Sequence, residues 1–249
     1  MTPTPLTIVT GASRGLGLAL AEQLLARGHR VLAISRRSPV LSTPAEGLTH
    51  WAADLADPAP VAERLAAWLA TLSTPDLGPA TLINNAGVIA APAPLAAQGA
   101  DGLANALRVG LEAPLLLTAA FLRATAAWPV PRKVLLISSG LGRRAMAGQA
   151  AYCAAKAGLD HLARAVALEE AGRPHGARIV SLAPGVIDTD MQQQLRTADA
   201  ALFPERERFV ALQAGGLLDR PAEAAAKVLR MLDRADFGSQ PVADVREAA

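Results

Sequence analysis

Apolar positions along the chain fall into short, nearly continuous runs that alternate with longer stretches in which they recur every three or four residues. The longer stretches predict helices at residues 15–26, 59–71, 101–127, 151–170 and 221–233, and Pro114 is expected to bend the third of them. The short runs predict strands at residues 6–10, 30–35, 48–52, 80–84, 132–138 and 177–183, with a last short strand near Val242.

Strands that alternate with helices are typical of βαβ units and a parallel sheet. The strands carry apolar residues on both faces, which is expected when helices cover both sides of the sheet. A length of 249 residues suits one such domain. We therefore predict a single α/β domain over residues 1–249, a doubly wound (Rossmann-type) parallel sheet with helices on both faces. The polar and apolar residues of the long insertion at 190–216 predict a mobile flap over a site.

The charge pattern and the cysteine count exclude several function classes. The formal net charge is +2, and the chain has no long run of basic or of acidic residues. The charge pattern therefore does not favour binding to nucleic acid or to a membrane surface. Cys153 is the single cysteine and the four histidines have no ligand spacing, so we expect neither a disulfide nor a metal site. The chain lacks an apolar run of about 18 residues and a signal peptide, so we expect a cytoplasmic protein without a membrane span.

A glycine-rich turn joins the first predicted strand to the first predicted helix. Glycine allows a pyrophosphate to approach the free N–H groups of a helix N-terminus, where a Cβ atom would block it. An ordinary tight turn is the alternative, but the position between strand and helix favours dinucleotide binding. The residues predicted to contact the cofactor here are Gly11, Ser13, Arg14, Gly15, Leu16 and Gly17.

The end of the second predicted strand indicates which nicotinamide cofactor is used. Enzymes that use NAD usually carry an acid there to hold the ribose hydroxyls, but this chain has Ser35, followed by Arg36 and Arg37. A guanidinium can pair with a 2′-phosphate, and Arg14 is a second candidate for that contact. We therefore predict NADP(H), although solvated loop arginines would give the same pattern.

Tyr152 and Lys156 lie four residues apart in a predicted helix, which places them on one face. The phenol of a free tyrosine has a pKa near ~10, and a neighbouring ammonium lowers that pKa because it favours the phenolate. A tyrosine tuned in this way can protonate a carbonyl oxygen while hydride reaches the carbon. Ser139 ends the preceding strand region and can hold the same oxygen. Alone, Tyr-x-x-x-Lys is equally typical of an amphipathic helix surface.

Together these motifs resemble the short-chain dehydrogenase/reductase family, and they follow its order over nearly the whole chain. The resemblance implies a cofactor half at roughly 1–130 and a substrate half at roughly 131–249. It also implies that Ser139, Tyr152 and Lys156 are catalytic, and that Tyr152 and Lys156 also contact the cofactor. The further cofactor contacts that it implies are Asp54, Leu55, Asn84, Ala86, Gly87, Pro184, Gly185, Ile187 and Thr189.

The second half resembles more specifically the sepiapterin reductases and the bacterial reductases of 1,2-diketones such as benzil. That resemblance implies a vicinal dicarbonyl substrate that contacts Ser139 and Tyr152, and it implies a substrate contact at Asp244 near the C-terminus. The residues Val245-Arg246-Glu247 differ from the aromatic ending of sepiapterin reductases, and Asp244 would equally be a solvated carboxylate. Another small ketone or a 3-ketoacyl compound is the alternative substrate.

One departure concerns the asparagine that the family usually carries in the long helix between the fourth and fifth strands, as part of a proton relay. Gly110 stands at that position here, and Asn105 lies five residues earlier on another side of the helix. Our hypothesis is that Gly110 lowers turnover without abolishing it. A low-turnover NADP(H)-binding regulator is the rival interpretation. The long apolar helices at 101–127 and 151–170 also predict a homodimer or homotetramer, as is usual in the family.

Overall fold

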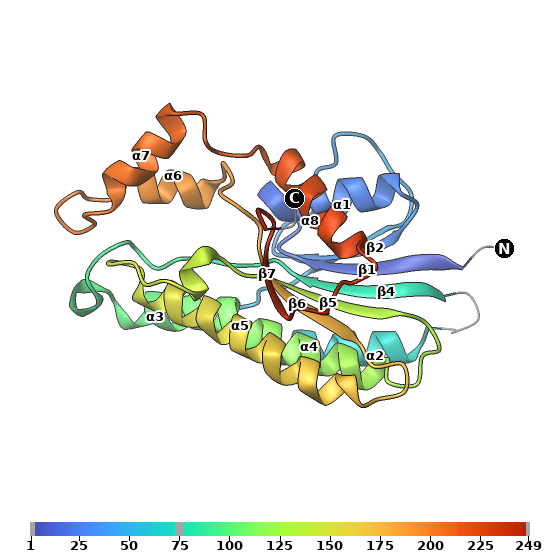
Figure 1. Ribbon diagram of the computed structural model, residues 1–249. Coiled ribbons are helices and arrows are strands. Elements are labelled where there is room, and N and C mark those ends of the chain that lie inside the picture. The colour runs from blue at the N-terminus through green and yellow to red at the C-terminus, as the bar shows by residue number, and fades with distance from the viewer. Residues whose placement is uncertain (1–2, 73–76, 248–249) are drawn as a thin grey trace.

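The computed structural model describes residues 3–72 and 77–247 and contains a seven-stranded parallel sheet with the strand order β3-β2-β1-β4-β5-β6-β7 (Figure 1). Every strand pairs with its neighbours in the parallel direction, so the predicted fold class is confirmed. The strands are β1 (Thr4–Thr10), β2 (Arg30–Ser35), β3 (Leu48–Ala52), β4 (Leu77–Asn84), β5 (Arg132–Ile137), β6 (Arg178–Ala183) and β7 (Val242–Asp244).

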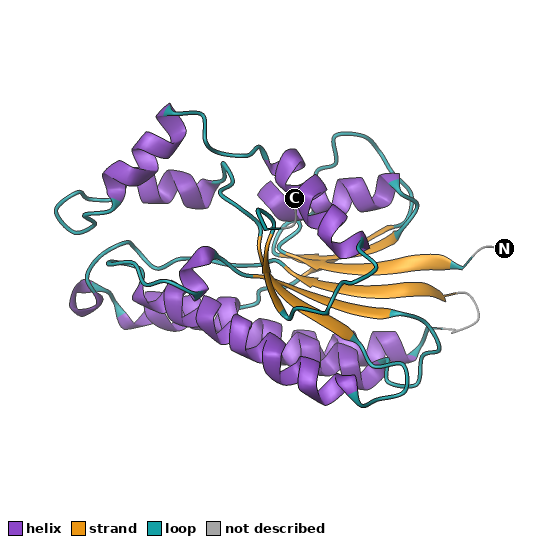
Figure 2. Cartoon of the chain, in the orientation of Figure 1, coloured by secondary structure: helices purple, strands orange, loops and turns teal. Residues whose placement is uncertain are grey.

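Helices cover both faces of the sheet (Figure 2). On one face lie α1 (Gly15–Ala26) and α8 (Pro221–Asp233), which pack against each other. On the other lie α2 (Pro58–Ala70), α4 (Ala113–Ala124) and α5 (Ala150–Ala171). The predicted helices therefore exist, two of them with the predicted ends and the other three with ends shifted by one to three residues.

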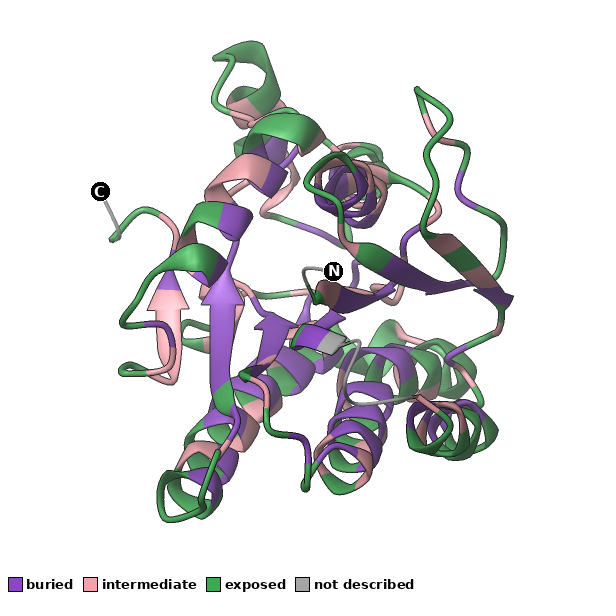
Figure 3. Ribbon diagram, turned by 90° about the vertical axis from the view of Figure 1, so that its right-hand side faces the viewer, coloured by how far each residue is buried: buried purple, intermediate pink, exposed green. Residues whose placement is uncertain are grey.

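Successive side chains of the central strands enter two different cores, as the alternation of a β-strand requires. Leu82 and Val134 belong to the core under α2, α4 and α5, whereas Ile83 and Leu135 belong to the core under α1 and α8. The inner strands of the sheet are accordingly mostly buried, whereas the edge strands β3 and β7 are partly exposed (Figure 3). This two-sided burial explains why the strands read as continuous apolar runs.

The long helix between β4 and β5 is continuous over Ala100–Ala124. It consists of α3 (Ala100–Leu107), a π-helical turn at Arg108–Glu112 and α4. Pro114 follows this turn directly. A proline has no N–H and its ring collides with the carbonyl of the residue four positions earlier, so a locally wider turn accommodates it without ending the helix. The helix is long and apolar enough to cross a membrane by length and composition, but half of its most apolar stretch is buried, and it packs against α2.

The segment predicted as a flap folds into two short helices, α6 (Asp190–Arg196) and α7 (Arg206–Ala214), which the sequence did not predict. They lie beyond the carboxyl ends of the strands, apart from the two main cores (Figure 1). A small apolar cluster of their own, formed by Leu195, Phe203 and Phe209, holds them together. The flap is thus an ordered layer over the end of the sheet where the site lies.

Candidate active site

A cleft of about 830 Å³ opens at the carboxyl ends of the strands, where the loops after β1, β2, β4, β5 and β6 face α6 and α7. The strand order reverses between β1 and β4, so the loops that follow these two strands diverge and leave a crevice. Its volume is that of a small-molecule or cofactor site. Nearly all of the residues predicted for the site line this cleft.

The glycine-rich turn approaches the loop after β4 so closely that side chains are excluded. Gly11 has φ +68°, and a Cβ atom added there would lie 2.9 Å from the Cα of Ala86. Gly15 has φ +54° and, with Leu16 and Gly17, lines the cleft at the start of α1. No side chain caps that helix end, so its first N–H groups are available to an anion. The turn therefore fits the pyrophosphate of a dinucleotide.

The loop after β4 is fixed to this turn by Thr10 and Asn85. The hydroxyl of Thr10 accepts hydrogen bonds from the backbone N–H groups of Asn85 at 2.9 Å and Ala86 at 3.0 Å. The structure does not bring Asn84 to the cleft, contrary to the sequence prediction. Strand alternation turns its side chain to the opposite face, where it donates to Thr118 at 3.1 Å, and Asn85 lines the cleft instead.

At the end of β2 the cleft presents an arginine without an acidic partner. Arg36 lines the cleft and forms no ion pair within the part of the chain that the structure describes. Ser35 donates to the carbonyl oxygen of Arg37 at 2.8 Å, and Arg37 itself lies outside the cleft lining. Arg14 pairs with Asp190 of the flap at 2.5 Å. The other predicted cofactor contacts that line the cleft are Ser13, Asp54, Leu55, Gly87, Pro184, Gly185, Ile187 and Thr189.

The three residues predicted to be catalytic meet in the cleft. Ser139 follows β5, and its hydroxyl accepts from the N–H of Leu141 at 3.2 Å. Tyr152 and Lys156 lie on the same side of α5, with the Lys156 Nζ 5.4 Å from the centre of the phenol ring. The ammonium donates to the carbonyl oxygen of Ile137 at 2.6 Å, which holds it under the end of β5.

Burial is the largest influence on the pKa values of both Tyr152 and Lys156. Burial raises the pKa of Tyr152 to about 12, against the opposing influence of the Ser139 hydroxyl, so the phenol is not acidified. Burial also lowers the pKa of Lys156 to about 8, although the carboxylate of Asp160 raises it. Burial is the largest influence on the phenol, so the structure does not reproduce the lowered tyrosine pKa expected from the neighbouring ammonium, and that lowering stays a prediction.

Asp160 lies one turn after Lys156 and forms a buried polar cluster under the catalytic helix. Its Oδ1 accepts from the hydroxyls of Ser138 and Ser181, both at 2.7 Å, and its Oδ2 accepts from the Nε of Arg143 at 3.2 Å. The side chain is 2% exposed. These bonds tie α5 to the ends of β5 and β6, and they fix the position of the helix that carries Tyr152 and Lys156.

The part of the cleft beyond Ser139, Tyr152 and Lys156 is lined by apolar and polar side chains, many of them from α6 and α7. The sequence indicates Arg144 as a candidate border of the substrate mouth, although it favours a solvated turn, and it does not predict the other residues because they are scattered along the chain and carry no motif. The residues that line this part are Val88, Ile89, Asn105, Arg144, Met146, Gln149, Met191, Gln192, Leu195, Arg208, Phe209, Leu212 and Arg246.

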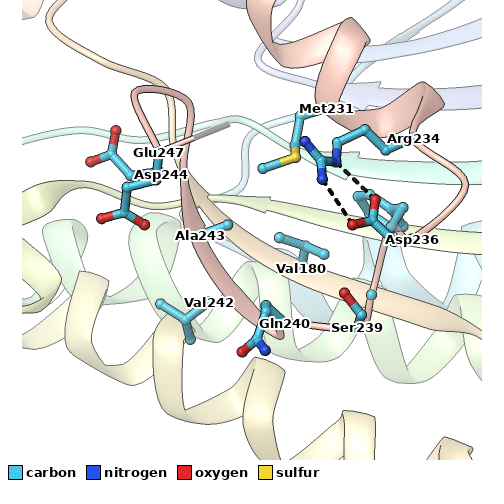
Figure 4. Close-up of a pocket in the computed structure, with 12 residues that line it drawn as sticks. Val180, Met231, Arg234, Asp236, Ser239, Gln240, Val242, Ala243, Asp244 and Glu247 are labelled. Carbon is cyan, nitrogen blue, oxygen red and sulfur yellow. Dashed lines mark hydrogen bonds and ion pairs between the residues drawn. The ribbon is translucent and has the colours of Figure 1, made fainter. Parts of the chain in front are cut away.

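Asp244 does not line the cleft, so the geometry gives no support to the predicted substrate contact. Its carboxylate is 3% exposed and accepts from Arg246, whose Nε lies at 2.8 Å, and this ion pair holds the pKa of Asp244 below its usual value. Asp244 instead borders a separate cavity of about 340 Å³ beside β7 (Figure 4). Arg246, on the other hand, reaches the cleft. Among the described residues, no group of three or more His, Cys, Asp or Glu residues could hold a metal ion.

Comparison with known proteins agrees with this geometry. A family model described as short chain dehydrogenase matches residues 5–200. The chain is 34% identical over 245 residues to an (S)-benzoin-forming benzil reductase of Bacillus cereus. The match covers 96% of this chain and 98% of the relative. The chain is 35% identical over 249 residues to the sepiapterin reductase of Rattus norvegicus, covering 93% and 92%. A short-chain dehydrogenase/reductase structure from Burkholderia vietnamiensis matches over 100% of both chains, with a TM-score of 0.68 and 38% identity.

Proposed function

The chain belongs to the short-chain dehydrogenase/reductase family, and on that premise we propose that it is an NADPH-dependent reductase of vicinal dicarbonyl compounds with Tyr152 as the proton donor. The family membership makes it an oxidoreductase of the ketone/alcohol type that uses NAD(P)(H) and small carbonyl substrates. The observation that carries the proposal is the meeting of Ser139, Tyr152 and Lys156 in one cleft with the glycine-rich turn.

In this proposal Tyr152 acts chiefly in the direction of reduction. A phenol with a pKa of about 12 keeps its proton at neutral pH, so the proton is present when the carbonyl oxygen gains electron density. Ser139 holds that oxygen, and Lys156 lies close enough to stabilise the phenolate after the proton has left. The bound nicotinamide supplies the hydride to the carbonyl carbon. Water is kept from the site by the apolar side chains of the flap.

The preference for NADPH rests on Arg36. Its guanidinium faces the cleft at the end of β2, where it would pair with a 2′-phosphate, and no acid at position 35 competes for it. Gly15–Gly17 at the start of α1 would hold the pyrophosphate, and Asp54 would lie beside the adenine. Replacing Arg36 with alanine is expected to raise the KM for NADPH by about tenfold or more and to leave the KM for NADH nearly unchanged.

The dicarbonyl substrate rests on the relatives and on the shape of the cleft. The benzil reductase relative is named for a 1,2-diketone, the sepiapterin reductase relative is named for a 2-hydroxy ketone, and the apolar side chains of the flap suit an aryl or alkyl body. We also propose that the chain works in the cytoplasm, an expectation that rests on its single cysteine and unremarkable charge.

The decisive experiment compares NADPH oxidation with benzil, diacetyl, sepiapterin and a 3-ketoacyl thioester, using wild type and Tyr152→Phe. Turnover of benzil or sepiapterin that falls by at least about a thousandfold in the variant is the expected result. Preferred turnover of the thioester would replace the dicarbonyl by a 3-ketoacyl substrate. NADPH binding without turnover of any of the four would favour the regulatory interpretation.

A further inference from the structure

Two glutamine side chains in the walls of the cleft are buried with polar atoms that have no hydrogen-bond partner. Gln149 is 4% exposed and Gln192 is 8% exposed, and both line the cleft. The Nε2 atom of Gln149 and the Oε1 atom of Gln192 each lack a partner in the part of the chain that the structure describes. A buried amide without a partner disfavours folding, so neither side chain is explained by stability.

Gln149 stands directly before α5, three residues ahead of Tyr152. Its backbone is held by two bonds: its N–H donates to Met146, and its carbonyl oxygen accepts from Cys153 at 2.8 Å. This fixed backbone presents the side chain to the cleft about one helical turn from the phenol. Gln149 lines the same cleft as Ser139 and Tyr152.

Gln192 comes from the opposite wall, on α6 of the flap. The charged side chains around it are engaged elsewhere: Asp188 pairs with Arg196, and Asp190 pairs with Arg14. These acids are therefore not available to a substrate, whereas the two amides are. The unpartnered Nε2 of Gln149 is a donor that an oxygen of a ligand can satisfy, whereas the unpartnered Oε1 of Gln192 is an acceptor that requires an N–H or O–H group.

We propose that Gln149 selects substrates with an oxygen on the carbon next to the reacting carbonyl. This inference rests on the proposed function, because it assumes that Ser139 and Tyr152 hold one carbonyl of the substrate. The Gln149 N–H group then donates to the neighbouring carbonyl oxygen of a 1,2-diketone, or to the oxygen of a 2-hydroxy ketone. A mono-ketone leaves that amide unpaired and is selected against.

The test compares benzil with deoxybenzoin, the mono-ketone that has the same two phenyl rings but lacks the second oxygen. The expected result for Gln149→Met is a loss of at least about tenfold in kcat/KM for benzil with little change for deoxybenzoin, because one hydrogen bond is removed. Gln149→Glu, which has the same size but no N–H donor, is expected to lose benzil activity in the same way. Gln193→Met on the exposed side of α6 is the matched control and is expected to change neither rate.

Thermal melting separates this role from a structural one. Removing a buried, unpartnered amide is expected to leave the melting temperature of Gln149→Met unchanged or higher. An unchanged ratio of benzil to deoxybenzoin activity in both Gln149 variants would overturn the inference, and so would equal losses on the two ketones with a lowered melting temperature. If wild type reduces neither compound with NADPH, the proposed dicarbonyl function itself fails, and the inference falls with it.

Discussion

At the scale of single residues, Asp160 controls the charge of the catalytic lysine. Its carboxylate lies one turn from Lys156 and raises the pKa of that lysine, while burial lowers the pKa to about 8. Below this pH the ammonium is charged and can stabilise the phenolate of Tyr152, and above it the charge is lost. We therefore expect the kcat/KM for carbonyl reduction to decline as the pH rises through about 8.

Asp160→Asn removes the charge that raises this pKa among the described residues, so the decline is expected to move to lower pH. The measurement is the pH profile of kcat/KM with a saturating cofactor concentration. Glu169→Gln, an exposed carboxylate on the same helix, is the matched control. A profile that stays in place in Asp160→Asn, with the protein folded, would show that Asp160 acts only through its bonds to Ser138 and Ser181.

The sequence predicts a site residue when the reason for that residue lies in its own turn or helix. Gly11 and Gly15 are predictable because the turn needs positive φ angles, and Tyr152 and Lys156 because a helix fixes their spacing. Gln149 and Arg246 reach the cleft only through the tertiary fold, so no spacing reveals them. The choice between Asn84 and Asn85 depends on the strand face at the last residue of β4, and the raised pKa of Tyr152 depends on burial, which composition does not give.

At the scale of elements, the π-helical turn places Gly110 against the catalytic helix. A Cβ atom added at Gly110 would lie 3.1 Å from the Cβ of Ala155, the residue before Lys156. An asparagine there would restore the side chain that the family usually carries, but it must also displace this contact. We expect Gly110→Asn to raise kcat for carbonyl reduction, by less than about tenfold, if the restored relay outweighs the crowding.

Gly110→Ala separates the two effects because it adds the Cβ atom without the amide. It is expected to lower the melting temperature as Gly110→Asn does, since both crowd Ala155, but to lower kcat where the asparagine raises it. Equal turnover in wild type and Gly110→Asn would remove the hypothesis that the glycine limits the rate.

The flap is stabilised by its own apolar cluster, so it can be loosened without damage to the sheet. Phe203 is fully buried and stacks on Phe209 with 5.8 Å between the ring centres, and Phe209 lines the cleft. Phe203→Ala is expected to raise the KM for the carbonyl substrate by about tenfold and to change the KM for NADPH little. Leu202→Ala, at a 41% exposed neighbour, is the control. If Phe203→Ala changes the KM for the carbonyl substrate and the KM for NADPH equally, the apolar cluster of the flap supports the cofactor part of the cleft as well.

The elements that the sequence predicts are those whose apolar positions recur with a clear period. The apolar pattern does not predict helix α7, because this helix begins with three charged residues and buries only Phe209. Helix α6 is too short to show a period, with only Gln192 and Leu195 buried. The π-helical turn is invisible in the same way, because Pro114 indicates a distortion but not its form.

At the scale of the whole molecule, the alternation of strands and helices predicts the sheet but not the strand order. The crossover that places β4 beside β1 follows from packing both helix layers, and it creates the crevice at the carboxyl ends. The two cores are foreseeable because the strands carry apolar residues on both faces. The site between the sheet and the flap becomes visible only once the chain is folded.

The outer surface of α4 and α5 is the part of the molecule that we propose to bind a second copy of this chain. Both helices cover the same face of the sheet, and both leave leucines in solvent: Leu115 is 44% exposed and Leu168 is 81% exposed. Two small residues of α5, Ala154 and Ala157, are also exposed and would allow close approach of a second helix pair. A stable dimer buries about 1,200–2,000 Å² in total, an area that two helices of this length can supply.

We therefore expect light scattering to give a mass of about twice the 25.6 kDa of one chain, or four times if a second interface forms. Leu115→Glu with Leu168→Glu places charges in this interface and is expected to shift the protein toward the monomer, because a buried unpaired carboxylate opposes association. Leu217→Glu, at a 66% exposed leucine after the flap, is the control and is expected to leave the mass unchanged. Because α5 also carries Tyr152 and Lys156, the monomeric variant is expected to lose thermal stability and part of its turnover together. If light scattering of the wild type gives the mass of a single chain at all concentrations, this interface does not exist and the exposed leucines have no role in assembly.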